Sequence, residues 1–183
     1  MPDRIARGVT LAFAATLAAG VVRAGEPYGI GRPATPQEIA GWDIDVSPSG
    51  AGLPPGRGDV QQGEAIFTAK CAACHGVHGE GKPMDALVGG IGTISTPKPH
   101  KTVGSFWPYA TTLFDYVRRA MPLNAPQSLT PDEVYSVSAY VLFLNGIVPQ
   151  DTTLDADNLA KIKMPNRNGF VSAYPAPEAG AKP

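Results

Sequence analysis

The chain has 183 residues, and its 15 basic and 16 acidic residues give a formal net charge of −1. A near-neutral chain without a basic cluster gives no reason to expect nucleic-acid binding. The 21 glycines and 19 prolines indicate much loop and few regular elements. The length allows one domain with extended tails, or at most two small domains.

Residues 1–24 have the layout of a secretory signal peptide. Arg4 and Arg7 precede an apolar run over 8–22, and Val22-Arg23-Ala24 offers acceptable residues at the −3 and −1 positions of a cleavage site. The alternative is an uncleaved membrane anchor, but a spanning helix needs about 20 apolar residues and this run is shorter. The pattern predicts cleavage after Ala24 and a periplasmic protein whose mature chain has no membrane span.

Residues 25–58 are expected to form an extended arm and a linker. In Thr35-Pro36-Gln37-Glu38, a threonine N-cap precedes a proline at the first helical position and a glutamate at the third, which predicts one short helix. Ile39 and Trp42 would share one face of that helix. The stretch SPSGAGLPPGRG, 47–58, is typical of a linker.

The region 59–148 predicts a domain built from three helices. Asp59 can cap a first helix that runs into two cysteines, with Gly63 and Phe67 on one face of it. A glycine-rich loop follows, and a second helix is predicted over 108–120.

The third helix opens with a capping box, Thr130-Pro131-Asp132-Glu133, and is expected to run to about Asn145. Gly146 is a natural helix stop. Residues 149–183 are expected to form a polar, proline-containing C-terminal tail. The sequence shows no convincing run of alternating strand pattern and no internal repeat.

The stretch Cys71-Ala72-Ala73-Cys74-His75 matches C-x-x-C-H and holds both cysteines of the chain. On a helix that ends here, the two thiols can reach the two vinyl groups of one haem, with His75 placed beneath the iron; this is the attachment pattern of c-type haem. Zinc would need further ligands, and a thioredoxin-like pair would need a βαβ setting. A disulfide would close a very small loop and stabilise little. The sequence therefore predicts one covalent haem c.

Met121 is the predicted sixth iron ligand. It stands at the end of the second helix, where Pro122 holds it, and an M-P pair there could present the thioether to the open face of the haem. The alternative is that Met121 packs the core, because methionine fills apolar gaps well. The remaining candidates after the attachment site are Met164, the runner-up, then His100, and finally Met84 and His78, which are close to His75 in sequence.

Aromatic and basic residues of the second helical region could line the haem rim. Arginine suits the propionate carboxylates, and Trp107 is expected at the haem edge. For the arginines, a solvated helix face is an equally good interpretation. The residues concerned are Trp107, Tyr109, Arg118 and Arg119. Lys98 and Lys101 could attract an acidic redox partner, although two lysines on a loop more often mark ordinary surface.

The order of helix, C-x-x-C-H, glycine loop, second helix, M-P and closing helix resembles a class I cytochrome c. That resemblance implies an all-α fold of three main helices around one haem, with irregular N- and C-terminal arms here. In that family the first and last helices cross at a glycine and aromatic contact, which Gly63 and Phe67 against Tyr140 and Val141 would match.

A narrower resemblance covers nearly all of the mature chain. The stretches YGIGRPATPQEIAGWDIDV, GSFWPYATTLFDYVRRAMPLNAPQSLT, LNGIV and MPNRNGF are similar to the cytochrome subunit of the sulfane dehydrogenase of the sulfur-oxidising (Sox) system. Close relatives of that subunit accompany sulfite dehydrogenases. The resemblance implies a partner subunit with a molybdenum cofactor, which oxidises the sulfur compound, and a downstream cytochrome or other electron acceptor. Some members carry a second haem domain, whereas this chain has a single C-x-x-C-H.

The predicted function is therefore electron transfer by a monohaem cytochrome c that is not itself an enzyme. Iron held by His75 and Met121 would leave no position for a substrate. The arm around Trp42 and the tail around Phe170 are hypothesised to lie on the molybdenum-bearing partner, and the alternative is that they fold back onto their own domain. Two other functions stay open: a freestanding shuttle, and a haem enzyme or sensor with an open iron site.

Overall fold

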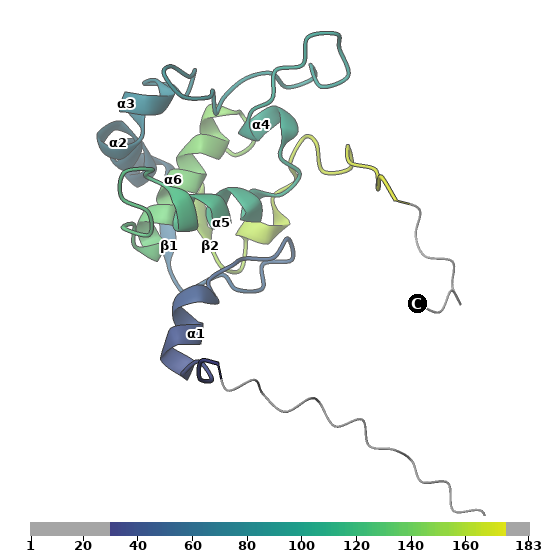
Figure 1. Cartoon of the computed structure of the whole chain (residues 1–183). Coiled ribbons are helices and arrows are strands. Elements are labelled where there is room, and N and C mark those ends of the chain that lie inside the picture. Colours follow the sequence, from purple (N-terminus) through teal and green to yellow (C-terminus); the bar gives the residue numbers. More distant parts are fainter. Residues whose placement is uncertain (1–29, 175–183) are drawn as a thin grey trace, which may run out of the picture. The chain divides into compact units, whose positions relative to one another are not determined.

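The structure is a computed structural model that describes residues 30–174 (Figure 1). The predicted signal peptide, 1–24, lies outside the described residues. Residues 36–183 make up one compact unit, to which every element below belongs, and residues 1–35 make up another, of which the exposed stretch 30–35 is described.

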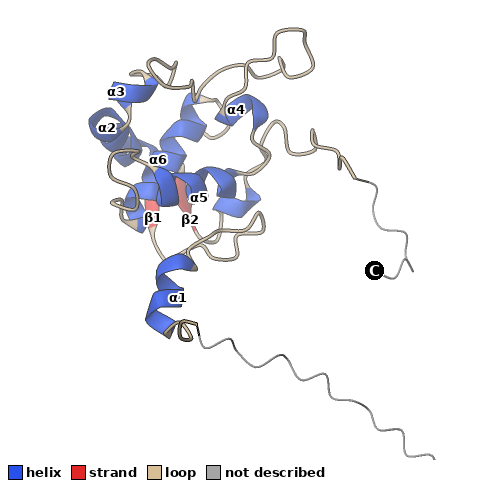
Figure 2. Cartoon of the chain, viewed as in Figure 1, coloured by secondary structure: helices blue, strands red, loops and turns tan. Residues whose placement is uncertain are grey.

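Helices dominate the described part of the chain, and the two strands are short (Figure 2). The elements in chain order are α1 (Pro36–Trp42), β1 (Arg57–Asp59), α2 (Val60–Lys70), α3 (Ala72–His75), α4 (Val103–Phe106), α5 (Ala110–Ala120), α6 (Pro131–Leu144), β2 (Thr153–Asp155) and a 3-10 turn (Leu159–Lys161). The predicted all-α class is confirmed. No helix of residues 30–174 is both long and apolar enough to cross a membrane.

The predicted helix caps of α2 and α6 are present. The Asp59 carboxylate accepts a hydrogen bond from the Gln62 N–H at 2.8 Å. At the start of α6 the Thr130 hydroxyl accepts from the Glu133 N–H at 3.3 Å, and the Glu133 carboxylate accepts from the Thr130 N–H at 2.8 Å. These bonds satisfy backbone donors that have no partner inside the helix, so both helices begin where the sequence places them.

α2 and α6 cross at Gly63, as the resemblance to class I cytochromes c implies. A side-chain carbon at this buried glycine would lie 2.0 Å from the Ser136 carbonyl oxygen. One turn further along α2, the Phe67 ring lies 5.3 Å from the Tyr140 ring. The glycine lets the two backbones approach, and the aromatic pair fills the space beside the crossing.

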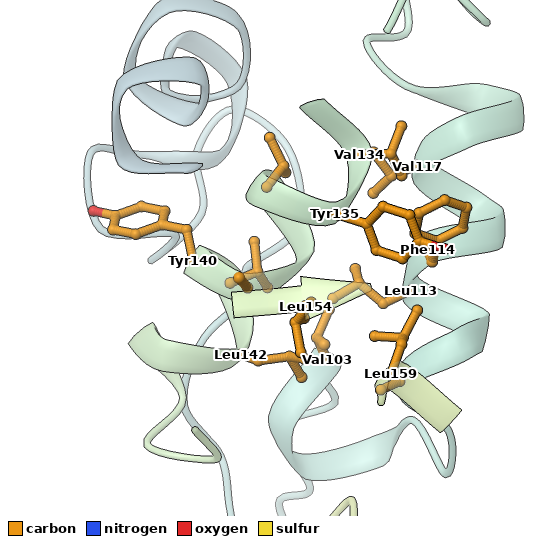
Figure 3. Close-up of a cluster of buried hydrophobic side chains, with 14 of the residues drawn as sticks. Val103, Leu113, Phe114, Val117, Val134, Tyr135, Tyr140, Leu142, Leu154 and Leu159 are labelled. Carbon is orange, nitrogen blue, oxygen red and sulfur yellow. The ribbon is translucent and has the colours of Figure 1, made fainter. Parts of the chain in front are cut away.

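A single apolar core surrounds α6. Figure 3 shows side chains of α6, α5, α4 and the C-terminal segment meeting there. Phe114 and Tyr135 are fully enclosed, with ring centroids 4.5 Å apart. α6 is buried over most of its length, and its two charged residues, Asp132 and Glu133, lie in its first turn.

The segment 44–58, which the sequence predicts to be arm and linker, is bound to the helices. The Val46 N–H donates to Asp115 of α5 at 2.9 Å, and Arg118 donates to the Ile44 carbonyl at 3.0 Å. Val46 is buried in the core. The glycine and proline content favours a linker, but α5 holds the segment through these bonds, and Tyr135 of α6 adds a hydrogen bond to the Pro54 carbonyl at 2.9 Å. We call 44–58 the N-terminal strap.

The segment 149–164, which the sequence places in the tail, also joins the core. β2 pairs antiparallel with β1, with Gly58 opposite Leu154. Leu154, Leu159 and Met164 are almost fully buried, at 1%, 0% and 3% exposure. The two strands have three residues each, too few for alternation to be visible in the sequence.

Candidate haem-binding site

The C-x-x-C-H stretch forms the junction of α2 and α3. Cys71 ends α2 through its N–H, which donates to the Phe67 carbonyl at 2.8 Å, and its own carbonyl accepts from His75 N–H at 3.0 Å. Cys71 is half-buried and Cys74 is exposed, and no disulfide joins them. One short helical stretch therefore carries all three attachment residues.

The environment of the cysteines disfavours the redox and zinc alternatives. Burial raises the pKa of the Cys71 thiol to about 11, against the opposing effect of Lys70, so the thiol stays protonated at neutral pH. A redox-active cysteine needs a thiolate. Across residues 30–174, no three histidine, cysteine or acidic residues come together to hold a metal ion.

His75 is oriented by its own loop. Its Nδ1 lies 2.8 Å from the Asp85 carbonyl oxygen. Because a carbonyl can only accept, Nδ1 carries the proton, and the lone pair of Nε2 is free for a metal. A histidine that ligates a metal commonly donates its other N–H in this way.

The glycine-rich loop folds back on the attachment stretch. The Gly81 N–H donates to the His75 carbonyl at 2.7 Å, and the Met84 N–H donates to the Cys74 carbonyl at 3.0 Å. Gly81 has a φ of 96°, in the region that favours glycine. Asp85 is therefore held where its carbonyl meets His75.

Asn145 joins this loop to the end of α6, a role that sequence reasoning missed. Its amide nitrogen donates to the Leu87 carbonyl at 3.1 Å and to the Val141 carbonyl at 2.8 Å, while its oxygen accepts from Gly89 N–H at 3.2 Å. The Asn-Gly pair at the helix end signals a cap, but nothing in the sequence shows that its amide spans two segments.

Met121 stands at the end of α5, where its N–H donates to the Val117 carbonyl at 3.1 Å. Its side chain is only partly buried. Met164 is 3% exposed within the core, so its sulfur is already enclosed by protein. The other candidates, Met84, His78 and His100, are all exposed.

Trp107 packs edge-on against Tyr116 of α5, with ring centroids 5.8 Å apart. The guanidinium of Arg118 reaches the N-terminal strap at Ile44, and that of Arg119 forms an ion pair with Asp115. The contacts seen for both arginines are therefore within the protein, and their role at a haem rim stays a prediction. A hollow of about 820 Å³ is lined by residues 160–169 and by none of the three attachment residues.

The donor set fits a covalently attached haem. Two thiols three positions apart could form the two thioether bonds, and an imidazole with a free Nε2 could ligate the iron. Covalent attachment thus uses two cysteines for which the structure disfavours zinc binding and, at Cys71, thiolate formation.

Two comparisons with known proteins agree with this chemistry. A family model described as "Cytochrome c" matches residues 60–145. The chain is also 44% identical to a chain of the sulfane dehydrogenase SoxCD from Paracoccus pantotrophus, with a TM-score of 0.75, over 82% of this chain and 73% of that one. The chain belongs to the cytochrome c family. This cytochrome c accordingly carries covalent haem c, and the predicted resemblance to the sulfane dehydrogenase cytochrome is confirmed.

Two curated relatives of this cytochrome c are thiosulfate dehydrogenases. The one from Allochromatium vinosum is 33% identical over 85 residues, and the one from Stutzerimonas stutzeri is 27% identical over 144 residues. The matches cover 46% and 76% of this cytochrome but only 31% and 43% of the two relatives. This cytochrome thus spans less than half the length of either.

Proposed function

We propose that this cytochrome c is a periplasmic, monohaem electron-transfer subunit of a sulfite or sulfane dehydrogenase. It takes electrons from a partner subunit with a molybdenum cofactor and passes them to a downstream cytochrome or other acceptor. The observation that carries the proposal is the extent of the likeness to the SoxCD chain, 82% of this chain. The family model spans only residues 60–145, so the likeness extends beyond the part that cytochromes c share.

Each residue of the site has a distinct task in electron transfer. Cys71 and Cys74 fix the cofactor covalently, His75 supplies the proximal ligand, and Met121 supplies the sixth. Haem bound in this way exchanges one electron at a time, and a methionine ligand raises its reduction potential. If His75 and Met121 both hold the iron, the site would bind no substrate, and the sulfur chemistry would belong to the partner.

The arm before the strap and the C-terminal tail together supply the partner surface. Trp42 is 89% exposed at the end of α1, and Tyr174 is 82% exposed in the C-terminal tail. Tryptophan and tyrosine are enriched at interfaces, where they bury much area at little entropic cost. Phe170 has a mixed role, since it is half-exposed and also lies edge-on against Phe106.

The test is electron transfer within a purified assembly. The cytochrome is isolated from its own host, and the dehydrogenase subunit is expected to accompany it through gel filtration. Adding sulfite, or sulfane sulfur on its carrier, should reduce the haem with that subunit present and not without it. A cytochrome that runs alone and is never reduced by the subunit would instead be a freestanding shuttle.

Direct oxidation of thiosulfate is the second candidate, because both curated relatives carry that activity in their names. It requires an iron position open to a small ligand. The ferric cytochrome alone is mixed with thiosulfate, and the ferrous form with carbon monoxide. Reduction by thiosulfate together with rapid carbon monoxide binding would favour the enzyme, and failure of both would favour the carrier.

A further inference from the structure

The C-terminal segment 164–170 packs against the connection between α4 and α5. Its first residue, Met164, is 3% exposed and packs in the core. Its shape is set by two turns, in which Arg167 N–H donates to the Met164 carbonyl and Gly169 N–H to the Asn166 carbonyl, each at 3.1 Å. We call this segment the C-terminal bracket. It lies outside the region matched by the cytochrome c family model.

Three contacts join the bracket to residues 106–109. Asn166 donates from its side-chain nitrogen to the Phe106 carbonyl at 2.7 Å. The Phe170 ring meets the Phe106 ring edge-on at 5.1 Å. The Arg167 guanidinium lies 4.3 Å from the centre of the Tyr109 ring. Phe106 precedes Trp107 and Tyr109 follows it in the chain. The three contacts therefore fix the backbone on both sides of Trp107.

The indole of Trp107 is held from a different direction. Its ring meets Tyr116 of α5 edge-on at 5.8 Å, and α5 leads directly to Met121. α4, which precedes Trp107, begins with a capping box between Thr102 and Ser105. The position of Trp107 therefore depends on α4, on α5 and on the bracket, and the bracket is the only one of these three without helical hydrogen bonds to stabilise it.

We propose that the C-terminal bracket positions Trp107 over the haem edge and thereby limits the access of water to the haem. Asn166 is the main positioning residue, since it binds the backbone carbonyl immediately before Trp107. Burial and local polarity are among the factors by which a protein sets a haem reduction potential. The proposal rests on haem attachment at Cys71 and Cys74 and on the predicted place of Trp107 at the haem edge. It needs no dehydrogenase partner, so it can fail while the partner proposal stands.

The experiment uses the haem-loaded chain in a Trp42→Phe background, which leaves Trp107 as the single tryptophan, since the sequence has two. Asn166→Ala removes the hydrogen bond, and Phe170→Ala removes the ring contact at a half-exposed position that should tolerate the change. Asn168→Ala and Val171→Ala alter exposed neighbours and serve as controls. None of the four changes the net charge.

Two readouts are followed, neither of which measures turnover: Trp107 fluorescence, which a nearby haem quenches, and the haem reduction potential. Asn166→Ala and Phe170→Ala should each brighten the emission and lower the potential, while both controls match the parent. The proposal fails if the parent emission is already unquenched. It fails equally if both variants lose unfolding free energy without a change in emission or potential, because the bracket would then only stabilise the fold. If Asn166→Ala does not fold, Phe170→Ala decides by the same criteria.

Discussion

At the attachment site, backbone hydrogen bonds set the positions of the functional side chains. His75 is aimed by the Asp85 carbonyl, and that carbonyl is held by the loop bonds to Cys74 and His75. No charged side chain takes part in these contacts. The orientation of the imidazole should therefore depend little on pH, and substitutions that keep the loop backbone should leave it intact.

Substituting Met121 and Met164 in turn should distinguish the iron ligand from the methionine that packs the core. Met121→Ala should abolish the weak far-red sulfur-to-iron band and let carbon monoxide bind the ferrous haem rapidly. Met164→Ala should keep the band, but removal of a side chain enclosed in the core should lower the free energy of unfolding by about 2–5 kcal/mol. Optical spectra, carbon monoxide titration and denaturant unfolding of both variants check this. Loss of the band in Met164→Ala instead would exchange the two roles.

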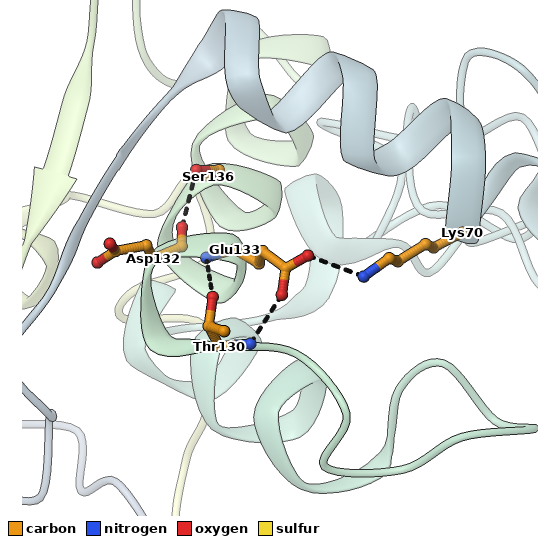
Figure 4. A network of polar contacts seen from close by, with 5 residues as sticks. All are labelled: Lys70, Thr130, Asp132, Glu133 and Ser136. Carbon is orange, nitrogen blue, oxygen red and sulfur yellow. Dashed lines mark hydrogen bonds and ion pairs between the residues drawn. The ribbon is translucent and has the colours of Figure 1, made fainter.

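Among the elements, the α2–α6 pair determines where the attachment stretch lies. Gly63 sets the crossing, and at the end of α2 the Lys70 ammonium bonds to the Glu133 carboxylate at 2.8 Å (Figure 4). Lys70 immediately precedes Cys71, and Glu133 also closes the α6 capping box. The Lys70–Glu133 ion pair thus links the first turn of α6 to the residue next to the first cysteine.

Gly63→Ala should be strongly destabilising, because an added carbon would lie 2.0 Å from backbone that cannot move without separating the helices. We expect a loss of about 3 kcal/mol, at the upper end of the range for overpacked core positions, or failure to accumulate holoprotein. Gly41→Ala is the matched control, since nothing lies within 4 Å of the added carbon in α1. Thermal unfolding of the two variants makes the comparison; similar midpoints would contradict the close crossing.

The Lys70–Glu133 contact should make the free energy of unfolding depend on pH in the acidic range. Lys70 and the Thr130 N–H lower the pKa of Glu133, so its stabilising effect is complete above the unfolded-state pKa and is lost as the pH falls through the lower, folded-state pKa. Both side chains are partly exposed, so Glu133→Gln should cost no more than about 1 kcal/mol at pH 7. The difference from the parent should shrink below about pH 4. Urea unfolding between pH 3 and 7 tests this; a constant difference would show that the charge is irrelevant.

At the scale of the whole molecule, local sequence signals predicted the helix caps and the motif, whereas long-range contacts were missed, except the α2–α6 crossing, which the family resemblance implied. The caps at Asp59 and Thr130 and the C-x-x-C-H motif need only neighbouring residues, and the first two are present in the structure as expected. The burial of Leu154 and Leu159, the binding of the strap to α5 and the bridge made by Asn145 join segments that are far apart in the chain. Turn-rich composition describes such segments correctly but does not show what they contact.

Loosening the strap should reduce stability, whereas removing the arm before it should reduce binding to the partner. Asp115→Ala leaves the Val46 N–H without its partner and removes the ion pair to Arg119, so it should lower the free energy of unfolding by about 1–3 kcal/mol. Deleting residues 25–43 stops short of the strap and should leave stability within about 0.5 kcal/mol of the parent, while co-purification with the dehydrogenase subunit is lost. Denaturant unfolding and gel filtration of the assembly give the two quantities. If the deletion leaves the assembly intact, the arm is not the partner surface, and the C-terminal tail around Tyr174 becomes the segment to remove. If the deletion unfolds the domain instead, the boundary between arm and strap lies before residue 44.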